Sequence, residues 1–144
     1  MQTQKCFSLI ELVMVIVITG ILAAMAIPKL VDMTGDAAQS AVDYMSATLG
    51  SANVANVSGC YANNDVPKAK QCVKVNSCVD VGLLVVPNQP LSTTVTSADG
   101  VFFLTLDNAV ATSGAQATCA VNVNRGKVKY TNTVNFAVTG AGYN

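Results

Sequence analysis

The chain has 144 residues, of which 51% are apolar and 11% are charged, and its eight cations and eight anions give no net charge. This length suits one domain, and the balanced charge lacks the basic excess typical of nucleic-acid-binding proteins, so we do not expect nucleic acid as a specific ligand. Histidine is absent, which excludes a Ser-His-Asp triad and histidine-based metal sites; we expect no enzymatic activity, no cofactor and no metal site.

The N-terminal region begins with a short polar segment, Met1–Cys6, followed by 21 residues from Phe7 to Ile27 that contain one charge, Glu11. As a helix these residues would span about 31 Å, close to the ~30 Å hydrocarbon thickness of a bilayer. An ordinary signal peptide has a shorter apolar stretch, of about 7–15 residues. A lipoprotein cysteine would follow the apolar segment, whereas Cys6 precedes it. We therefore predict a transmembrane helix.

Glu11 is the informative residue of this helix, because a carboxylate inside a membrane helix costs about 2.5–3.5 kcal/mol on insertion scales. One interpretation places Glu11 near the interface, where it reaches water. The other is that it awaits a cation, although neither lysine nor arginine occurs between Phe7 and Pro28. Cleavage before Phe7 would create an α-amine four residues away, within reach on one helix face or from a neighbouring subunit.

The residues KCFSLIEL, from Lys5 to Leu12, resemble the type IV prepilin signature. In that family a short basic leader ends in glycine, a peptidase cuts before phenylalanine, and the new amine is N-methylated. The resemblance implies cleavage between Cys6 and Phe7, methylation of Phe7, and an assembly role for Glu11 as the fifth residue after the cut. Cys6 departs from the family's glycine.

The family also has a glycine and a proline within the apolar span, matched here by Gly20 and Pro28. Proline removes a helical hydrogen bond, and glycine lowers helix propensity by about 1 kcal/mol. The resemblance implies that the helix between these two residues unwinds during assembly.

After Pro28 the three- and four-residue spacing of apolar and small residues predicts that the helix continues to about Val57 with one buried face. We assign to this face Leu30, Met33, Ala37, Ala41, Tyr44, Thr48, Ala52 and Ala55, and we take Met45 as core too. Ser58-Gly59 is read as a helix stop. The expected organisation is a leader at 1–6, a transmembrane and filament-core helix at 7–28, and a globular domain at 29–144, with its helix at 29–57, a loop at 58–79 and a sheet at about 80–140.

The later residues favour β structure. Val79–Leu84 reads as a short helix or strand, and strands are expected at 101–106, 117–124 and 134–138. The turn Asn124-Arg125-Gly126 predicts a hairpin whose second strand is 127–131. The fold class is therefore α+β, a long N-terminal helix packed on a small antiparallel sheet of three or four strands.

Four cysteines, Cys60, Cys72, Cys78 and Cys119, lie in this domain, and two disulfides allow three pairings. Their spacings contain no Cys-x-x-Cys pair, which disfavours a zinc site. We favour Cys60–Cys72, which closes a short loop, and Cys78–Cys119, which ties that region to the sheet. Two disulfides indicate an oxidising compartment.

The resemblance implies a structural subunit of a type IV pilus that supports adhesion, motility or DNA uptake. Its implied partners are identical or related pilins, the prepilin peptidase and methylase, the inner-membrane assembly machinery and, before assembly, the lipid bilayer. The implied location is a single-pass inner-membrane protein, then an extracellular filament. One alternative is a type II secretion pseudopilin, although the calcium loop usual there needs acids, and none follows Asp107. The other alternative is a monomeric, membrane-tethered periplasmic binding module.

Overall fold

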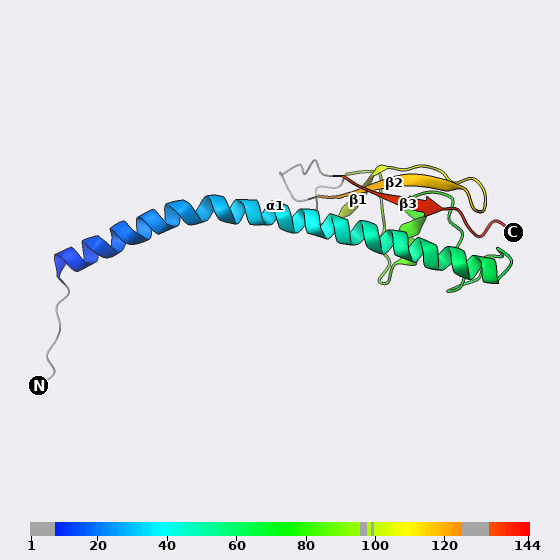
Figure 1. Cartoon of the computed structure of the whole chain (residues 1–144), viewed down its shortest axis with the longest axis horizontal. Coiled ribbons are helices and arrows are strands. Elements are labelled where there is room, and N and C mark those ends of the chain that lie inside the picture. The colour runs from blue at the N-terminus through cyan, green and yellow to red at the C-terminus, as the bar shows by residue number, and fades with distance from the viewer. Residues whose placement is uncertain (1–7, 96–97, 99, 125–132) are drawn as a thin grey trace, which may run out of the picture. The chain divides into compact units, whose positions relative to one another are not determined.

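The computed structural model of the chain describes residues 8–95, 98, 100–124 and 133–144, and the side chains of these residues except 27–32 and 34. Its elements are α1 (Leu9–Ala62), the 3-10 helix η1 (Val79–Leu84), β1 (Phe102–Leu106), β2 (Gln116–Val123) and β3 (Val134–Thr139), shown in Figure 1. The chain divides into two compact units, Met1–Ala37 and Ala38–Asn144. The expected α+β class is confirmed.

The end of α1 lies five residues beyond the predicted end at Val57, so the interpretation of Ser58-Gly59 as a stop was wrong. Gly59 serves a close approach instead, because a Cβ there would lie 2.1 Å from the carbonyl oxygen of Gln71. The helix ends where Asn64 and Asp65 adopt positive φ angles of 54° and 61°. Such left-handed residues commonly terminate helices.

The buried face of α1 also differs from the predicted one. Its core residues are shifted by about one position from the predicted stripe and include Ala38, Val42, Met45 and Leu49. Met45 is core as expected, whereas Tyr44 is 73% exposed and Met33 is 62% exposed. The prediction failed because alanine fits either face of a helix, and because the true face contains two buried asparagines, Asn53 and Asn56, which a search for apolar residues does not find.

The sheet has the order β1-β2-β3, and both pairs are antiparallel. Phe102 pairs with Val123 at one end, and a register shift separates Leu104 from Leu106. Strands β2 and β3 pair from Gln116 and Thr139 to Val121 and Val134. The three strands lie where the alternating apolar pattern placed them. The fourth strand expected at 127–131 and its turn at 125–126 lie outside the described residues.

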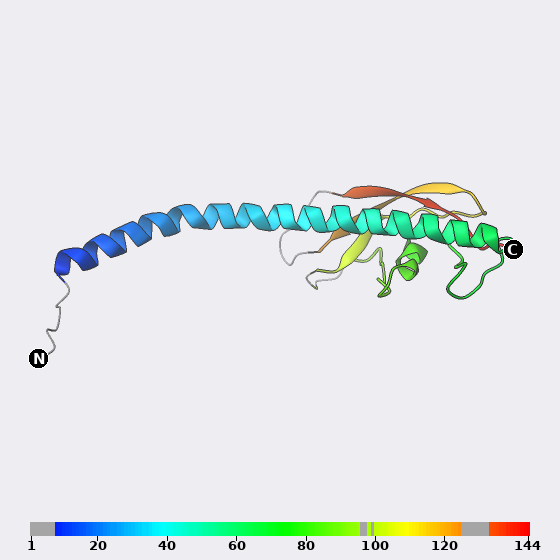
Figure 2. The ribbon, with the colours of Figure 1, turned by 60° about the horizontal axis from the view of Figure 1, so that its bottom comes forward.

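One core joins the sheet, η1 and the second half of α1. Figures 1 and 2 show the strands and η1 beside the part of α1 drawn in cyan to green. Side chains from all three parts are buried together, including Leu49 from α1, Val81 from η1 and Leu104 from β1. Beyond these elements, buried residues of the connecting segments complete this core: Val75, Leu91 and Val110.

Candidate functional site

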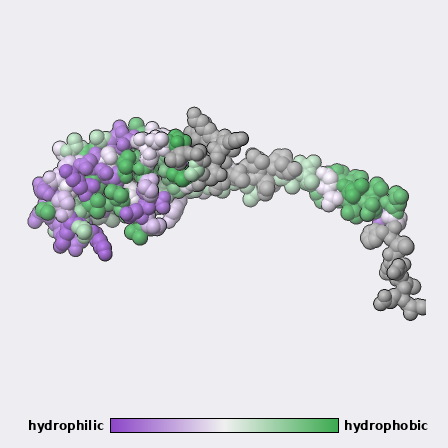
Figure 3. Space-filling model, turned by 180° about the vertical axis from the view of Figure 1, so that it is seen from behind, coloured by the Kyte–Doolittle hydropathy of each residue, from purple (hydrophilic) through white to green (hydrophobic). Residues whose placement is uncertain are grey.

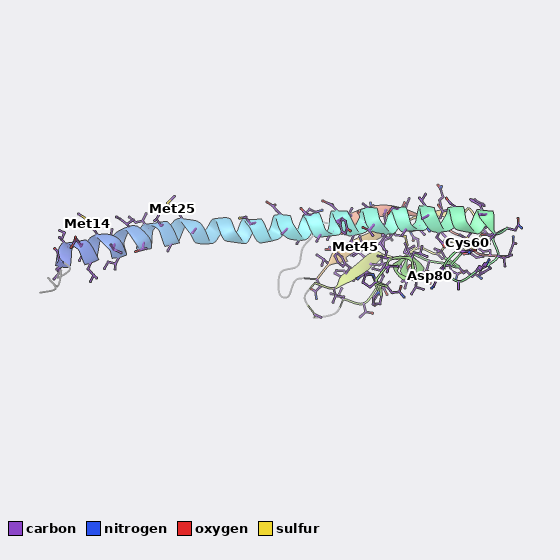
Figure 4. The ribbon with its side chains drawn as sticks, turned by 90° about the horizontal axis from the view of Figure 1, so that it is seen from below. Met14, Met25, Met45, Cys60 and Asp80 are labelled. Carbon is purple, nitrogen blue, oxygen red and sulfur yellow. A yellow bond between two sulfur atoms is a disulfide. The ribbon has the colours of Figure 1, made fainter. Side chains whose placement is uncertain are left out.

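The first unit contains an apolar helical surface that is exposed along the described part of the chain. Residues Leu9–Ala26 form the one described helical window that is long and apolar enough to cross a membrane, and none of it is buried. Its surface is mostly apolar in Figure 3, and Met14 and Met25 project away from the helix in Figure 4. A surface of this size and composition requires a lipid or protein partner.

Glu11, the one charged residue of this window, accepts one of two side-chain hydrogen bonds that cap the start of α1. The backbone N–H of Ser8 donates to Glu11 Oε2 at 2.9 Å, and the backbone N–H of Ile10 donates to Ser8 Oγ at 3.3 Å. Ser8, the residue before the helix, thus caps Ile10 with its hydroxyl, while the carboxylate of Glu11, the third helical residue, accepts from the N–H of Ser8. The arrangement is a capping box in which the serine bonds the second helical residue.

The capping box fixes where the carboxylate of Glu11 lies. It lies in the first turn, where the partial positive charge of the helix N-terminus stabilises an anion. An ionised carboxylate offers about four acceptor positions, and the N–H of Ser8 occupies one. Glu11 can therefore accept a further hydrogen bond from a cationic donor while it caps the helix.

The sequence analysis did not find this role of Ser8. The signal was present, since a serine followed three residues later by glutamate, just before an apolar run, is the sequence pattern of a capping box. The charge of Glu11 was interpreted only as a membrane feature, although its three-residue spacing from Ser8 also predicts a helix cap. The residues flanking the expected cleavage, Cys6 and Phe7, lie outside the described residues.

Helix α1 continues through Gly20 and Pro28. Proline has no N–H, so the carbonyl four residues before Pro28 lacks its usual donor. A Cβ at Gly20 would meet nothing within 4 Å, so packing within the chain does not explain the glycine. Unwinding between these residues remains a prediction about the assembled state.

Two disulfides staple the second unit, in the pairing that we favoured. Cys60 and Cys72 have Cα atoms 4.5 Å apart, and Cys78 and Cys119 have Cα atoms 5.8 Å apart. Asp65 lies beside the first pair, with its ligand atom within 4.8 Å of both sulfurs. Sulfur in a disulfide is not a thiolate, the form that binds zinc, so these three residues do not supply a metal site while the bridge is intact.

Asp65 holds the last described residues of the chain. Its carboxylate is buried and accepts hydrogen bonds from the N–H groups of Gly142, at 2.7 Å, and Tyr143, at 3.2 Å. The Gly142 bond, together with one from Ser113, lowers the pKa of Asp65 below its ordinary value, although burial opposes the shift. Gly142 is required here, because its φ is 75° and a Cβ would lie 2.9 Å from Cα of Lys74.

Tyr143 anchors the same terminal segment from its side chain. Its hydroxyl contacts the carbonyl oxygens of Val75, at 3.1 Å, and of Val110, and the Lys74 ammonium lies 4.9 Å from the ring centroid. Burial and the negative charges of Asp80 and Asp65 raise the pKa of Tyr143. These contacts join the terminal segment to two separate parts of the domain, the segment of Lys74 and Val75 and the segment of Val110.

Comparison with known proteins assigns the N-terminal region. The family described as "Prokaryotic N-terminal methylation motif" matches residues 1–27, a range that includes Cys6, Phe7, Glu11 and Gly20. A type IV narrow pilus major component, PilA5 of Thermus thermophilus, is 54% identical over 48 residues. The N-terminal region is therefore similar to that of a type IV pilin.

The match to the pilin relative covers 33% of this chain and 41% of PilA5, so this chain spans less than half of the curated relative that it matches. No solved structure matches the chain. The surface of this chain outside the matched segment is therefore interpreted from the residues that form it.

Proposed function

We propose that this chain is a structural subunit of a type IV pilus, held first in the inner membrane by α1 and then assembled into an extracellular filament. The observation that carries this proposal is the position of Glu11, the one acid of the apolar, exposed window Leu9–Ala26, at the capped start of α1. It lies within the segment that matches the methylation motif.

Processing supplies the cation for that acid. A prepilin peptidase cuts between Cys6 and Phe7 on the cytoplasmic side, and a methylase modifies the new amine of Phe7. The capping box already directs the carboxylate of Glu11 toward the helix start. The amine of the same or a neighbouring subunit can then bind it as a charge-assisted hydrogen bond.

Assembly then moves α1 from lipid into a bundle of equivalent helices. Lipid tails are as apolar as leucine, so this transfer gains little hydrophobic energy and needs directional contacts. A buried ion pair sets register more than it adds net stability, and Glu11 is the charged residue of the apolar window Leu9–Ala26 that can form one. The partners are other pilin subunits and the inner-membrane assembly machinery.

The proposal is tested by shearing cells that carry pilus machinery and express the full chain. We expect the sheared fraction to contain filaments whose subunits begin at methylated Phe7. A monomeric membrane tether would instead remain with the cells and give no filaments. In Glu11→Ala we expect the protein to stay in the membrane and to be lost from the sheared fraction, and normal piliation of this variant would contradict the proposed role.

A further inference from the structure

Charges of opposite sign are separated along this chain. After Lys29, the charged residues of α1 are all aspartates, of which Asp43 is the last, whereas residues 66–76 carry three lysines and no acid. The lysines Lys68, Lys70 and Lys74 are all exposed, and so is Asp43. The second unit thus presents an acid early on α1 and a basic loop near the end of α1.

The acid and the lysines do not meet within one chain. The side chain of Asn56 bonds both the N–H and the carbonyl of Val73, at 2.8 and 2.7 Å, which fixes the basic loop beside that turn of α1. Asp43 lies thirteen residues earlier, about 20 Å away along the helix axis. Among the described residues, none of the three lysines forms a salt bridge with a carboxylate.

A groove with both apolar and polar walls lies at the basic loop. Its volume is about 590 Å³, and Lys70 lines it together with two alanines of α1, with the aliphatic side chains of Leu83, Leu84 and Val86, and with the polar side chains of Asn56, Gln71 and Asn88. Val86 is 92% exposed and Leu83 is 53% exposed. The groove therefore offers one cation beside uncovered aliphatic side chains.

The surface around Asp43 has the complementary composition. Tyr44, the next residue, is 73% exposed and presents an aromatic ring beside the acid. Asp43 accepts a bond from Gln39 at 2.9 Å, which uses one of its acceptor positions and leaves others available. An acid beside an exposed ring on one copy matches a lysine beside a partly apolar groove on another.

We propose that the groove at Lys70 binds the Asp43–Tyr44 surface of a second copy of this chain, with the carboxylate on the Lys70 ammonium and the ring against Leu83 and Val86. The two surfaces differ, so the contact is heterologous. Contacts of this kind generate open filaments when the rotation does not close. This inference rests on the proposed pilus function and assigns it a subunit contact outside the apolar helix.

The test is a charge exchange in the full chain, expressed with pilus machinery. Lys70→Glu and Asp43→Lys each place like charges in the contact, and we expect each to lower the yield of sheared filaments about tenfold. The double variant restores opposite charges and should recover most of the wild-type yield. Lys68→Glu is the matched control, because this exposed lysine of the same loop does not line the groove, and its yield should stay near wild type.

If the wild type forms filaments, the pilus function stands. Normal yields for both single variants, or a yield of the double variant no higher than that of the single variants, would then overturn the proposed contact. If the wild type makes no filaments, the pilus function itself fails. Loss of DNA binding in Lys70→Glu with an unchanged filament yield would assign the lysine to nucleic acid instead. In each variant, non-reducing mass analysis should find both disulfides, which separates a lost contact from a lost fold.

A cross-link provides the second measurement. A disulfide needs Cα atoms about 4.4–6.8 Å apart, and positions 43 and 70 of one chain are too distant to be joined. Asp43→Cys combined with Lys70→Cys should therefore give a ladder of linked subunits from oxidised, sheared filaments on a non-reducing gel. Asp43→Cys combined with Lys68→Cys should give much less of it. Equal ladders from the two double variants, or no ladder from the variant with cysteines at positions 43 and 70, would refute the proposed contact.

Discussion

The side chain of Asn53 pairs with the backbone of Thr139 as a neighbouring strand would. Its Nδ2 donates to the Thr139 carbonyl at 3.0 Å, and its Oδ1 accepts from the Thr139 N–H at 2.7 Å. Asn56 makes the same paired contact with Val73 one turn later. Two amides on the buried face of α1 therefore fasten the end of β3 and the disulfide loop to the helix.

We expect Asn53→Ala to destabilise the domain by about 2–3 kcal/mol, because it leaves a buried N–H and carbonyl of Thr139 without partners. Thermal unfolding of the detergent-solubilised chain, followed by circular dichroism, measures this. Ser51→Ala, two residues away on the exposed side of α1, is the control and should change stability little. Equal melting temperatures for the two variants would show that the Thr139 contact contributes nothing.

These asparagines illustrate what the sequence can and cannot predict. Helix and strand positions follow from periodicity, and the three described strands lie where alternation placed them. The buried face of α1 does not follow from periodicity, because Asn53 and Asn56 are buried through contacts with residues 86 and 17 positions away. Contacts this distant cannot be read from the spacing of apolar residues along the helix.

The N-terminal site is predicted from local sequence, and its cleavage, methylation and assembly roles stay predictions. Its chemistry is local, since Glu11, the apolar run and the expected cleavage site lie within one short segment. The disulfide pairing was chosen correctly because a loop of twelve residues is short enough to close. The role of Asp65 was missed, because its partners Gly142 and Tyr143 lie at the other end of the chain.

The capping box predicts a selective effect at Ser8. Ser8→Ala should weaken the start of α1 by about 1 kcal/mol, since alanine cannot accept the N–H of Ile10, whereas Ser8→Thr should retain the cap. Amide hydrogen exchange in detergent measures this at Ile10 and Glu11. We expect faster exchange in the alanine variant alone. Equally fast exchange in the threonine variant would mean that the hydroxyl is not the cap.

The two disulfides should contribute unequally to stability. Removing Cys60–Cys72 as a pair of serines should cost about 3 kcal/mol, and removing Cys78–Cys119 about 4 kcal/mol, because the second closes the longer loop in the unfolded chain. Urea unfolding of the two double variants gives this comparison. The reverse order would show that the burial of Cys60 and Cys72, rather than loop length, dominates.

Acid should loosen the terminal segment through Asp65. Its pKa is lower in the folded protein than its ordinary value of 3.8, chiefly because of the Gly142 N–H. The folded state therefore favours the ionised form, and this stabilisation is complete above the ordinary pKa and lost as the pH falls through the folded value. Melting temperatures measured from pH 7 downward should fall more steeply in the wild type than in Asp65→Asn. Parallel curves would exclude Asp65 as the cause.

Intact mass and tandem spectrometry of the subunit from sheared extracellular fibres tests the central claim most directly. We expect a chain that begins at N-methylated Phe7, lacks the six leader residues and has four cysteines oxidised in two bridges. A full-length chain that retains Met1–Cys6 and occurs only as dispersed molecules in the cell envelope would contradict it.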